Sequence, residues 1–169
     1  MTPKDNTLSH EAGLVLRPLA VSDIPACSAL EHTCFAEPFS CKAYAEWLSL
    51  DTALGLVVEY RGVIIGLITG VVILQDAFVY NLAVCASVRR KRIGQALVSC
   101  FIEEAQKRGA TQVMLELRQS NEAAASLYHK LGFEIVGKRK DFYSSPKEDA
   151  LLLTKFCKER DSFHENTSH

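Results

Sequence analysis

The order of apolar and polar residues divides most of this chain into alternating segments and segments of helical spacing. Alternation and β-branched runs predict strands at 13–19, 76–85 and 111–119, a hairpin at 53–74 that turns at Tyr60-Arg61-Gly62, and two strands around a polar loop within 134–156. Apolar residues at helical spacing predict helices at 21–35, 38–48, 93–107 and 120–131. Strands and helices therefore alternate, and the chain contains no internal repeat or low-complexity segment.

Residues that begin and end helices sharpen these boundaries. Ser22 or Asp23 is placed to cap the first helix and Ser40 the second, because short polar side chains accept hydrogen bonds from first-turn amides. Gly109 and Gly132 are placed to end the third and fourth helices.

The mixture of strands and helices predicts an α+β fold, in which a mixed sheet carries helices on both faces. A length of 169 residues suffices for one domain with its own hydrophobic core. We expect that domain to span residues 13–157, since residues 1–12 and 158–169 read as polar, aperiodic tails.

Composition and charge exclude several classes of partner. Apolar residues make up 48%, charged residues 23%, and the net charge is −1, so no overall attraction to nucleic acid or to an anionic membrane is expected. No apolar run reaches the roughly 18 residues of a membrane-spanning helix, and the polar N-terminus lacks the hydrophobic segment of a signal peptide. The sequence predicts a cytoplasmic protein in which any anion site is local.

The six cysteines include no CxxC pair. Cys27, Cys34 and Cys41 are evenly spaced, but Pro38 interrupts any helix that would align them, and no histidine completes a zinc spacing. We therefore expect free, buried or partly buried thiols and no metal.

A run of four cations, Arg89 to Arg92, stands between the strand predicted at 76–85 and the helix predicted from Ile93. The first turn of a helix offers unpaired amides and the positive end of its dipole, and Gly94 allows close approach to the backbone. A solvated basic patch is the simplest alternative, while nucleic-acid binding would need further cations and aromatic side chains on the same face. The place of the run between strand and helix favours an anion site that suits a diphosphate.

Two longer segments, VYNLAVCASVRRKRIGQALV at 79–98 and LELRQSNEAAASLYHKLGF at 115–133, resemble the GNAT family of acetyl-CoA-dependent N-acetyltransferases. The similarity is closer still to the RimI-type members, which acetylate the α-amine of a ribosomal protein, and it extends to EPFS at 37–40 and RKDFYSSPKEDALLL at 139–153. It covers roughly residues 14–155 and implies the GNAT, or acyl-CoA N-acyltransferase, fold. It also implies acetyl-CoA as the cosubstrate that donates the acetyl group.

The resemblance assigns contacts to the cofactor. It implies that the pantetheine arm pairs with the backbone of Leu82, Ala83 and Val84, and that Asn121 binds near the thiol end. The loop and helix start that would hold the pyrophosphate comprise Arg89, Arg90, Lys91, Arg92, Ile93, Gly94 and Gln95. GNAT proteins usually carry Q/R-x-x-G-x-G/A here, and this chain has Arg92 in place of the first glycine. A side chain restricts a loop in which glycine is free, while a guanidinium is able to contact a phosphate.

Glu116 is an acidic residue between two leucines of a predicted strand. A solvent-facing position or an ion pair with Arg118 would account for it, but a strand, a turn and a helix can also bring it into one cleft with Tyr128. In RimI-type enzymes the matching residues are the general base and the general acid. The resemblance therefore implies that Glu116 takes the ammonium proton, that Tyr128 protonates the departing thiolate, and that backbone N–H groups at 82–83 polarise the carbonyl.

The implied acceptor is a primary amine, most directly the N-terminal α-amine of a protein such as a ribosomal protein. An α-amine has an ordinary pKa of about 7.7–8.0, against about 10.4 for lysine, so one carboxylate can serve as its base near neutral pH. In the loop predicted at 139–149, Tyr143 is placed to bond the acceptor backbone, and Glu148 or Asp149 to attract its positive charge. An ordinary polar hairpin tip would account for the same residues.

Other assignments stay open at this point. The loop at 139–149 is shorter than in the RimI pattern, which keeps lysine, polyamine, antibiotic and small-metabolite acceptors as alternatives. Arg92 at the usual glycine position keeps a non-catalytic coenzyme A-binding module as another. Cys85 follows the cofactor strand, but no histidine is placed to activate it, so packing is the expected role. His129 points about 100° away from Tyr128 on a helix, which favours the surface.

Overall fold

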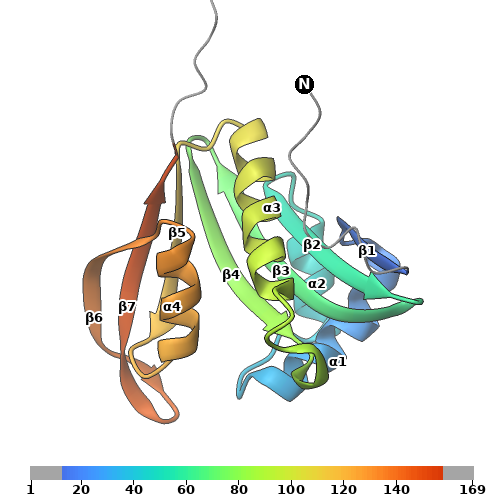
Figure 1. The fold of residues 1–169 in the computed structure, drawn as a ribbon, viewed down its shortest axis with the longest axis horizontal. Coiled ribbons are helices and arrows are strands. Elements are labelled where there is room, and N and C mark those ends of the chain that lie inside the picture. The colour runs from blue at the N-terminus through green and yellow to red at the C-terminus, as the bar shows by residue number, and fades with distance from the viewer. Residues whose placement is uncertain (1–12, 158–169) are drawn as a thin grey trace, which may run out of the picture.

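The computed structural model describes residues 13–157, which form one seven-stranded sheet with helices on its two faces (Figure 1). The predicted tails at 1–12 and 158–169 lie outside the described residues. In chain order the elements are β1 (Leu14–Pro18), η1 (Val21–Asp23), α1 (Ile24–Cys34), α2 (Cys41–Leu48), β2 (Ala53–Tyr60), β3 (Val63–Ile73), β4 (Asp76–Val84), η2 (Ala86–Val88), α3 (Ile93–Lys107), β5 (Gln112–Arg118), α4 (Glu122–Lys130), β6 (Glu134–Ser144) and β7 (Lys147–Phe156). No helix in this part of the chain is long and apolar enough to cross a membrane.

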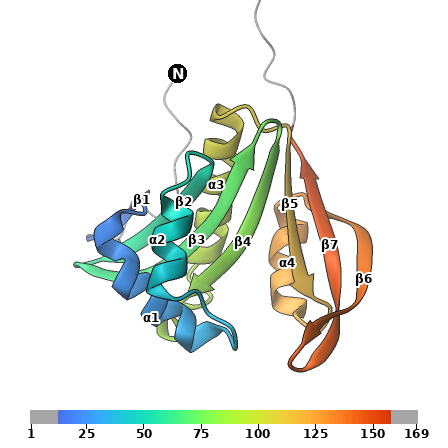
Figure 2. The same cartoon turned by 180° about the vertical axis from the view of Figure 1, so that it is seen from behind.

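Neighbouring strands follow the order β1-β2-β3-β4-β5-β7-β6. All neighbours are antiparallel except β4 and β5, which run parallel and are connected through α3. Helices α3 and α4 lie on one face in Figure 1, and the reverse view in Figure 2 shows α1 and α2 on the other. The α+β class, the mixed sheet and the helices on both faces are confirmed.

Two apolar clusters bury the two faces of the sheet. The larger one packs α3 and α4 against the strands around the fully buried Leu97 and Phe101. The smaller one packs α1 and α2 on the opposite face around the fully buried Cys27 and Tyr44. Each helix buries the face that its apolar spacing predicted, because only that stripe can exclude water against the sheet.

The predicted helix starts are partly confirmed. Ser40 caps α2, since its hydroxyl accepts a hydrogen bond from the Ala43 N–H at 3.1 Å. The prediction for the first helix is wrong: no side-chain cap forms at the start of α1. The short turn η1 precedes α1, and the Asp23 carboxylate accepts the N–H of Ala20 at 2.8 Å instead.

The polar loop predicted at 139–149 is largely strand. β6 continues to Ser144 and β7 begins at Lys147, so only Ser145 and Pro146 form the turn, joined by a cis peptide bond. Nearly every residue of β6 is exposed on this sheet edge. An edge strand with two wet faces has no apolar alternation, so the sequence pattern could not reveal it.

A β-bulge in β4 changes the direction in which its residues point. The register against β3 shifts between the pairs Thr69–Asn81 and Gly70–Val79, which leaves Tyr80 as the extra residue. Val79 before the bulge and Leu82 after it both face the α3 side, although uninterrupted alternation would put them on opposite faces.

Gly70, opposite this bulge, has no room for a side chain. An added Cβ would lie 2.0 Å from the carbonyl oxygen of Phe78 and 2.7 Å from the Phe101 ring. We expect Gly70→Ala to lower the free energy of unfolding by about 3 kcal/mol, because neither a ladder carbonyl nor a buried ring can withdraw without disturbing the core. Urea unfolding followed by tryptophan fluorescence measures this. Gly62→Ala is the control: its Cβ would meet nothing within 4 Å, so only its positive φ of 82° costs about 1 kcal/mol. Equal losses in both variants would contradict the steric argument.

Candidate active site

Strands β4 and β5 separate soon after they begin. Only Asp76 to Phe78 of β4 pair with Gln112 to Met114 of β5. Both views show the two strands diverging beyond that point (Figures 1 and 2). The last part of β4 therefore has a paired strand on the β3 side only, among the residues that the structure describes.

We call the side of β4 that faces β5 beyond these pairs the β4–β5 opening. The antiparallel ladder with β3 decides which peptide groups of β4 face it. The Cys85 N–H donates to the Ile65 carbonyl at 2.8 Å, and the groups that bond to β3 alternate from there. Leu82 and Val84 consequently turn their N–H and C=O groups away from β3, whereas Ala83 pairs with Leu67. Of the three residues predicted to bind pantetheine, Leu82 and Val84 have the orientation needed to pair with an extended ligand.

The start of α3 presents unpaired amides beside the end of β4. The first hydrogen bond of the helix runs from the Ala96 N–H to the Arg92 carbonyl at 3.0 Å, which leaves the N–H groups of Ile93, Gly94 and Gln95 without a backbone partner in residues 13–157. Such a helix start attracts an anion through these donors and through its dipole. The predicted diphosphate fits this position.

The four cations before α3 are exposed, and two of them have unusual backbone angles. Arg90 and Arg92 adopt positive φ values of 66° and 62°, in the left-handed region. Arg92 thus takes the conformation that glycine would adopt without strain, at a cost of about 1–2 kcal/mol. Arg89 folds back instead, and its Nε donates to the Val84 carbonyl at 3.3 Å.

Gly94 connects the helix start to the opening. A Cβ built there would lie 3.6 Å from the Leu127 side chain and 3.8 Å from those of Leu82 and Val84, which are ordinary contact distances. The turn before α3, the last part of β4 and helix α4 therefore meet at this glycine.

Gly94→Ala is expected to separate cofactor binding from stability. The protein alone has room for the methyl group, and alanine favours the helix by up to about 1 kcal/mol, so thermal stability should stay equal or rise. The methyl group would occupy the space through which a phosphate approaches the amides, so we expect a dissociation constant for coenzyme A about tenfold higher. Calorimetric titration measures the affinity. Unchanged affinity would place the diphosphate elsewhere.

Tyr128 of α4 lies in the larger core cluster and is 5% exposed. Its ring meets Phe133 edge-to-face at 5.2 Å between centroids. Burial alone raises the pKa of the Tyr128 hydroxyl, so the phenol stays protonated at neutral pH. Within residues 13–157 the Tyr128 hydroxyl has no hydrogen-bond partner, and its oxygen keeps a small exposed surface. The proton is therefore available to a ligand.

Glu116 lies on the opposite face of the sheet from Tyr128. Leu115 and Leu117 of β5 face the cluster that contains Tyr128, and strand alternation turns Glu116 the other way. The prediction of a common cleft implied that both side chains lie on one side of the sheet. In the structure they lie on opposite sides. Between them, strands β4 and β5 are no longer paired with each other beyond Phe78 and Met114.

The Glu116 side chain is 33% exposed and pairs with Arg139 of β6, with 3.4 Å between Nη1 and Oε1. The alternative partner considered from the sequence, Arg118, pairs with Glu148 at 3.3 Å instead. A half-exposed carboxylate with one long ion pair remains accessible to a proton from an incoming amine.

Tyr143 lies near Glu116 on this face. Arg118 stacks on its ring, with the guanidinium carbon 4.2 Å from the ring centroid. Burial, and next the charge of Glu116, raise the pKa of the Tyr143 hydroxyl. This residue lies beside the candidate base, and its contact with an acceptor stays a prediction.

Glu148 and Asp149 already have partners. Glu148 accepts the Ser120 N–H and pairs with Arg118, and these bonds hold the pKa of its carboxyl below the usual range. Asp149 accepts the Asp141 N–H at 2.8 Å and pairs with Lys138 at 3.2 Å, with the same direction of pKa shift. Both carboxylates therefore organise the β6–β7 hairpin, whatever further contact they make.

The remaining candidates lie as follows. The Asn121 side-chain oxygen caps α4 by accepting the Ala124 N–H at 3.2 Å, which fixes its position at the end of β5. His129 is exposed, as predicted.

Cys85 is half-buried, and its bond to Ser87 lowers the pKa of its thiol. All six cysteines are free, and Cys41 is exposed, contrary to the expectation that all would be at least partly buried. Residues 13–157 contain no cluster of three His, Cys, Asp or Glu side chains able to hold a metal.

The other face of the sheet holds a buried polar group that was not predicted from the sequence. Glu31 of α1 is fully buried and accepts hydrogen bonds from Tyr44 and Asn81. The signal was an acidic residue four positions after Cys27 and one after Leu30, within the apolar stripe of the first helix.

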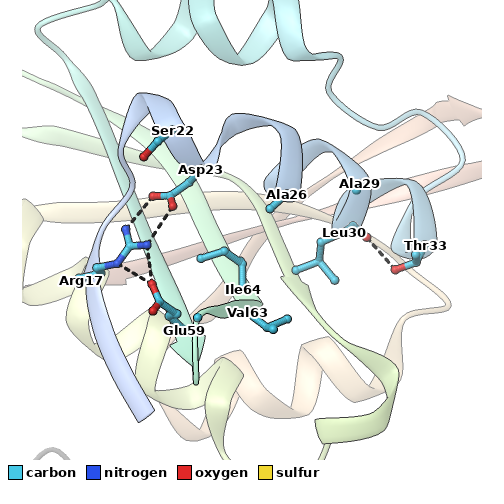
Figure 3. Close-up of a pocket in the computed structure, with 11 residues that line it drawn as sticks. Arg17, Ser22, Asp23, Ala26, Ala29, Leu30, Thr33, Glu59, Val63 and Ile64 are labelled. Atoms are coloured by element: carbon cyan, nitrogen blue, oxygen red, sulfur yellow. Dashed lines mark hydrogen bonds and ion pairs between the residues drawn. The ribbon is translucent and has the colours of Figure 1, made fainter. Parts of the chain in front are cut away.

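An open hollow of about 530 Å³ lies along α1, β1 and the β2–β3 turn (Figure 3). At one end Arg17 bridges Asp23 and Glu59, with 2.7 Å between nitrogen and oxygen in each pair. The hydrogen bond from Arg17 lowers the pKa of the Asp23 carboxyl. Arg17, Asp23 and Glu59 thus join β1 and β2 to the start of α1. None of the predicted site residues lines this hollow, so it is separate from the candidate site.

Comparison with known proteins gives consistent results. Residues 24–133 match the profile of the acetyltransferase (GNAT) family. The chain is 32% identical over 137 residues to the [ribosomal protein bS18]-alanine N-acetyltransferase of Escherichia coli strain K12, which covers 80% of this chain and 92% of that protein. It is 30% identical over 139 residues to the putative enzyme of that name from Bacillus subtilis strain 168, covering 82% and 92%. The crystal structure of the ribosomal-protein-S18-alanine N-acetyltransferase from Escherichia coli superposes with a TM-score of 0.80 at 28% identity, covering 89% of this chain and 99% of that one.

Proposed function

This chain belongs to the acetyltransferase (GNAT) family and is an N-acetyltransferase that uses acetyl-CoA, and we propose that its acceptor is the N-terminal α-amine of a protein, specifically of a ribosomal protein. The two relatives described above both carry the name of an alanine N-acetyltransferase for ribosomal protein bS18. The family match at residues 24–133 includes β4, α3, β5 and α4, which carry most of the candidate site.

The observation that carries the proposal is the placement of two proton-transfer groups on opposite faces of an open sheet. Tyr128 lies on the α3–α4 face, which also holds the free edge of β4 and the amides of α3. Glu116 and Tyr143 lie on the other face. Donor and acceptor would thus approach the opening from opposite sides and meet within it.

The free backbone of β4 and the start of α3 fit acetyl-CoA. Leu82 offers its N–H and C=O groups, and Val84 its N–H, to an extended arm, since the Val84 carbonyl already accepts from Arg89. The amides of residues 93–95 offer donors to a diphosphate. Acetyl-CoA supplies the acetyl group as a thioester. We assign the polarisation of its carbonyl to the Leu82 N–H, since that donor faces the opening and the Ala83 N–H does not.

Glu116 would act as the base. Its carboxylate takes the proton of the incoming ammonium group, directly or through a water molecule, and leaves a neutral amine as the nucleophile. Tyr128 would act as the acid, because its protonated phenol can pass a proton to the sulfur as the C–S bond breaks. Transfer would then be direct, with donor and acceptor bound together.

The acceptor face favours a peptide. Tyr143 is placed to bond a peptide backbone beside Glu116. Glu148 and Asp149 remain candidates for attracting a basic acceptor, although each carboxylate already pairs with a cation. We also propose a cytoplasmic location, because six unpaired cysteines suit a reducing compartment.

The test is an acceptor panel analysed by mass spectrometry. It contains a peptide with the N-terminal sequence of ribosomal protein bS18, the same peptide with a blocked N-terminus, a peptide whose only amine is a lysine side chain, and a polyamine. We expect acetylation of the free peptide alone, with fragment ions that locate the acetyl group on its α-amine. Efficient acetylation of the lysine peptide or the polyamine, with none at the α-amine, would overturn the acceptor assignment. Binding of coenzyme A without thiol release on any acceptor would indicate a non-catalytic module.

A further inference from the structure

Glu31 is a carboxylate with no exposed surface, in the cluster between α1, α2 and the sheet. The salt bridges formed within residues 13–157 do not include it. A buried carboxylate without a cation is costly unless hydrogen-bond donors satisfy its oxygens. The surroundings of Glu31 supply such donors.

Three segments donate to this one group. Tyr44 of α2 and the Asn81 side chain of β4 donate to Oε1, the latter at 3.0 Å, and the Phe39 N–H donates to Oε2 at 2.7 Å. Phe39 belongs to the connection between α1 and α2. The carboxylate thus ties α1 to α2, to that connection and to β4.

The contact with β4 lies at the bulge. Asn81 directly follows Tyr80, the extra residue, and directly precedes Leu82. The bulge is also fixed from β3, because Trp47 Nε1 donates to the Gly70 carbonyl at 2.9 Å and Gly70 lies against the Phe78 carbonyl. Both strands of the bulge are therefore anchored through buried polar contacts.

The bulge determines which N–H group faces the opening. Since the alternation of β4 restarts there, a displaced Asn81 would redirect the Leu82 peptide, and its N–H would no longer point away from β3. An N–H donor stabilises the developing negative charge on a carbonyl oxygen only when it is aimed at that oxygen.

We propose that Glu31 is a positioning residue, which holds the Leu82 N–H in its catalytic direction through Asn81. The proposal rests on the proposed function, because this direction matters for the reaction only if Leu82 polarises the acetyl donor. Glu31 itself touches no reacting atom.

The test compares two variants that each remove one donor from the same carboxylate oxygen. Asn81→Ala breaks the link to β4, and Tyr44→Phe breaks only the link to α2. For Asn81→Ala we expect kcat to fall by about tenfold while KM for acetyl-CoA changes less than about threefold, because misdirection affects the transition state more than ground-state binding. For Tyr44→Phe we expect kcat within about threefold of the original enzyme, whatever happens to its melting temperature.

A purely structural carboxylate would give a different result. Both variants would then lose activity only in proportion to their fraction unfolded, which thermal unfolding under the assay conditions measures. Original kcat in folded Asn81→Ala, or an equal loss in folded Tyr44→Phe, would overturn the proposal.

A double variant provides rescue. Asn81→Asp alone places a second carboxylate against Glu31, and we expect kcat to fall by at least about tenfold. Adding Glu31→Gln restores a donor–acceptor pair, since the amide at position 31 can donate to the carboxylate at position 81. Recovery of kcat to within about threefold supports the link, and recovery of the melting temperature without kcat contradicts it. The ratios can be measured with whichever amine the original enzyme accepts, so a wrong acceptor assignment would appear in the panel and not in these ratios.

Discussion

Replacing Glu116 with glutamine is expected to reduce kcat at pH 7 by about 10²–10⁴-fold, the contribution of a well-placed general base. The amide keeps the shape of the side chain and can still lie beside Arg139, but it cannot take a proton. Turnover should then depend on the fraction of acceptor that is already neutral. At pH 7 that fraction is small, because the ordinary pKa of an α-amine is about 7.7–8.0.

The sign of the pH dependence tests the role itself. Above about pH 8 the free amine predominates, so the deficit of Glu116→Gln should shrink as the pH rises toward 9.5. Thiol release measured from pH 6.5 to 9.5 on the bS18 peptide gives this profile. Glu122→Gln removes an exposed acidic residue in the first turn of α4 and should behave like the original enzyme. A loss of equal size at every pH would indicate a role in binding or positioning and contradict base catalysis.

Tyr128→Phe is expected to reduce kcat by about 10²–10³-fold, because the sulfur would have to depart as an unprotonated thiolate. Burial raises the pKa of the Tyr128 hydroxyl above its ordinary value near 10.0, so the original enzyme should keep a protonated phenol throughout the range from pH 7 to 9. Phenylalanine preserves the edge-to-face contact with Phe133, so the free energy of unfolding should change by less than about 1 kcal/mol.

The matched control is Tyr44→Phe, which removes the hydroxyl of a second buried tyrosine on the other face of the sheet. Steady-state kinetics of both variants, together with their unfolding curves, separate loss of the acid from loss of fold. A Tyr128→Phe enzyme with kcat close to the original would show that the thiolate receives its proton from elsewhere.

Much of the fold could be predicted from the sequence, because those features depend on local pattern. The alternation of Val113, Leu115 and Leu117 revealed β5 and its buried face, and the spacing from Ile93 to Lys107 revealed α3. Polar segments were predicted less well: residues 139–149 were expected to form a loop, but they form much of the β6–β7 hairpin. Strand pairing at a wet sheet edge depends on backbone hydrogen bonds, which composition does not report.

The residues of the candidate site were partly predicted from the sequence and partly found only in the structure. Sequence resemblance indicated Glu116, Tyr128 and the segment at 89–95, because these motifs are continuous in the chain. Sequence could not show that Arg92 adopts the left-handed φ of a glycine, or that Glu116 pairs with Arg139 and not with Arg118. A backbone angle at one residue and an ion pair across two strands are set by the surrounding packing.

The sequence by itself determined the family, the order of the elements and the residue types that can move protons in this protein. Only the tertiary structure decided on which face of the sheet each of these side chains lies. One extra residue at Tyr80 reverses the alternation of β4, turns the Leu82 N–H to the opening and brings Asn81 against the buried Glu31. The direction of a strand residue depends on its pairing with the neighbouring strand, and contacts between residues 50 positions apart exist only once the chain has folded.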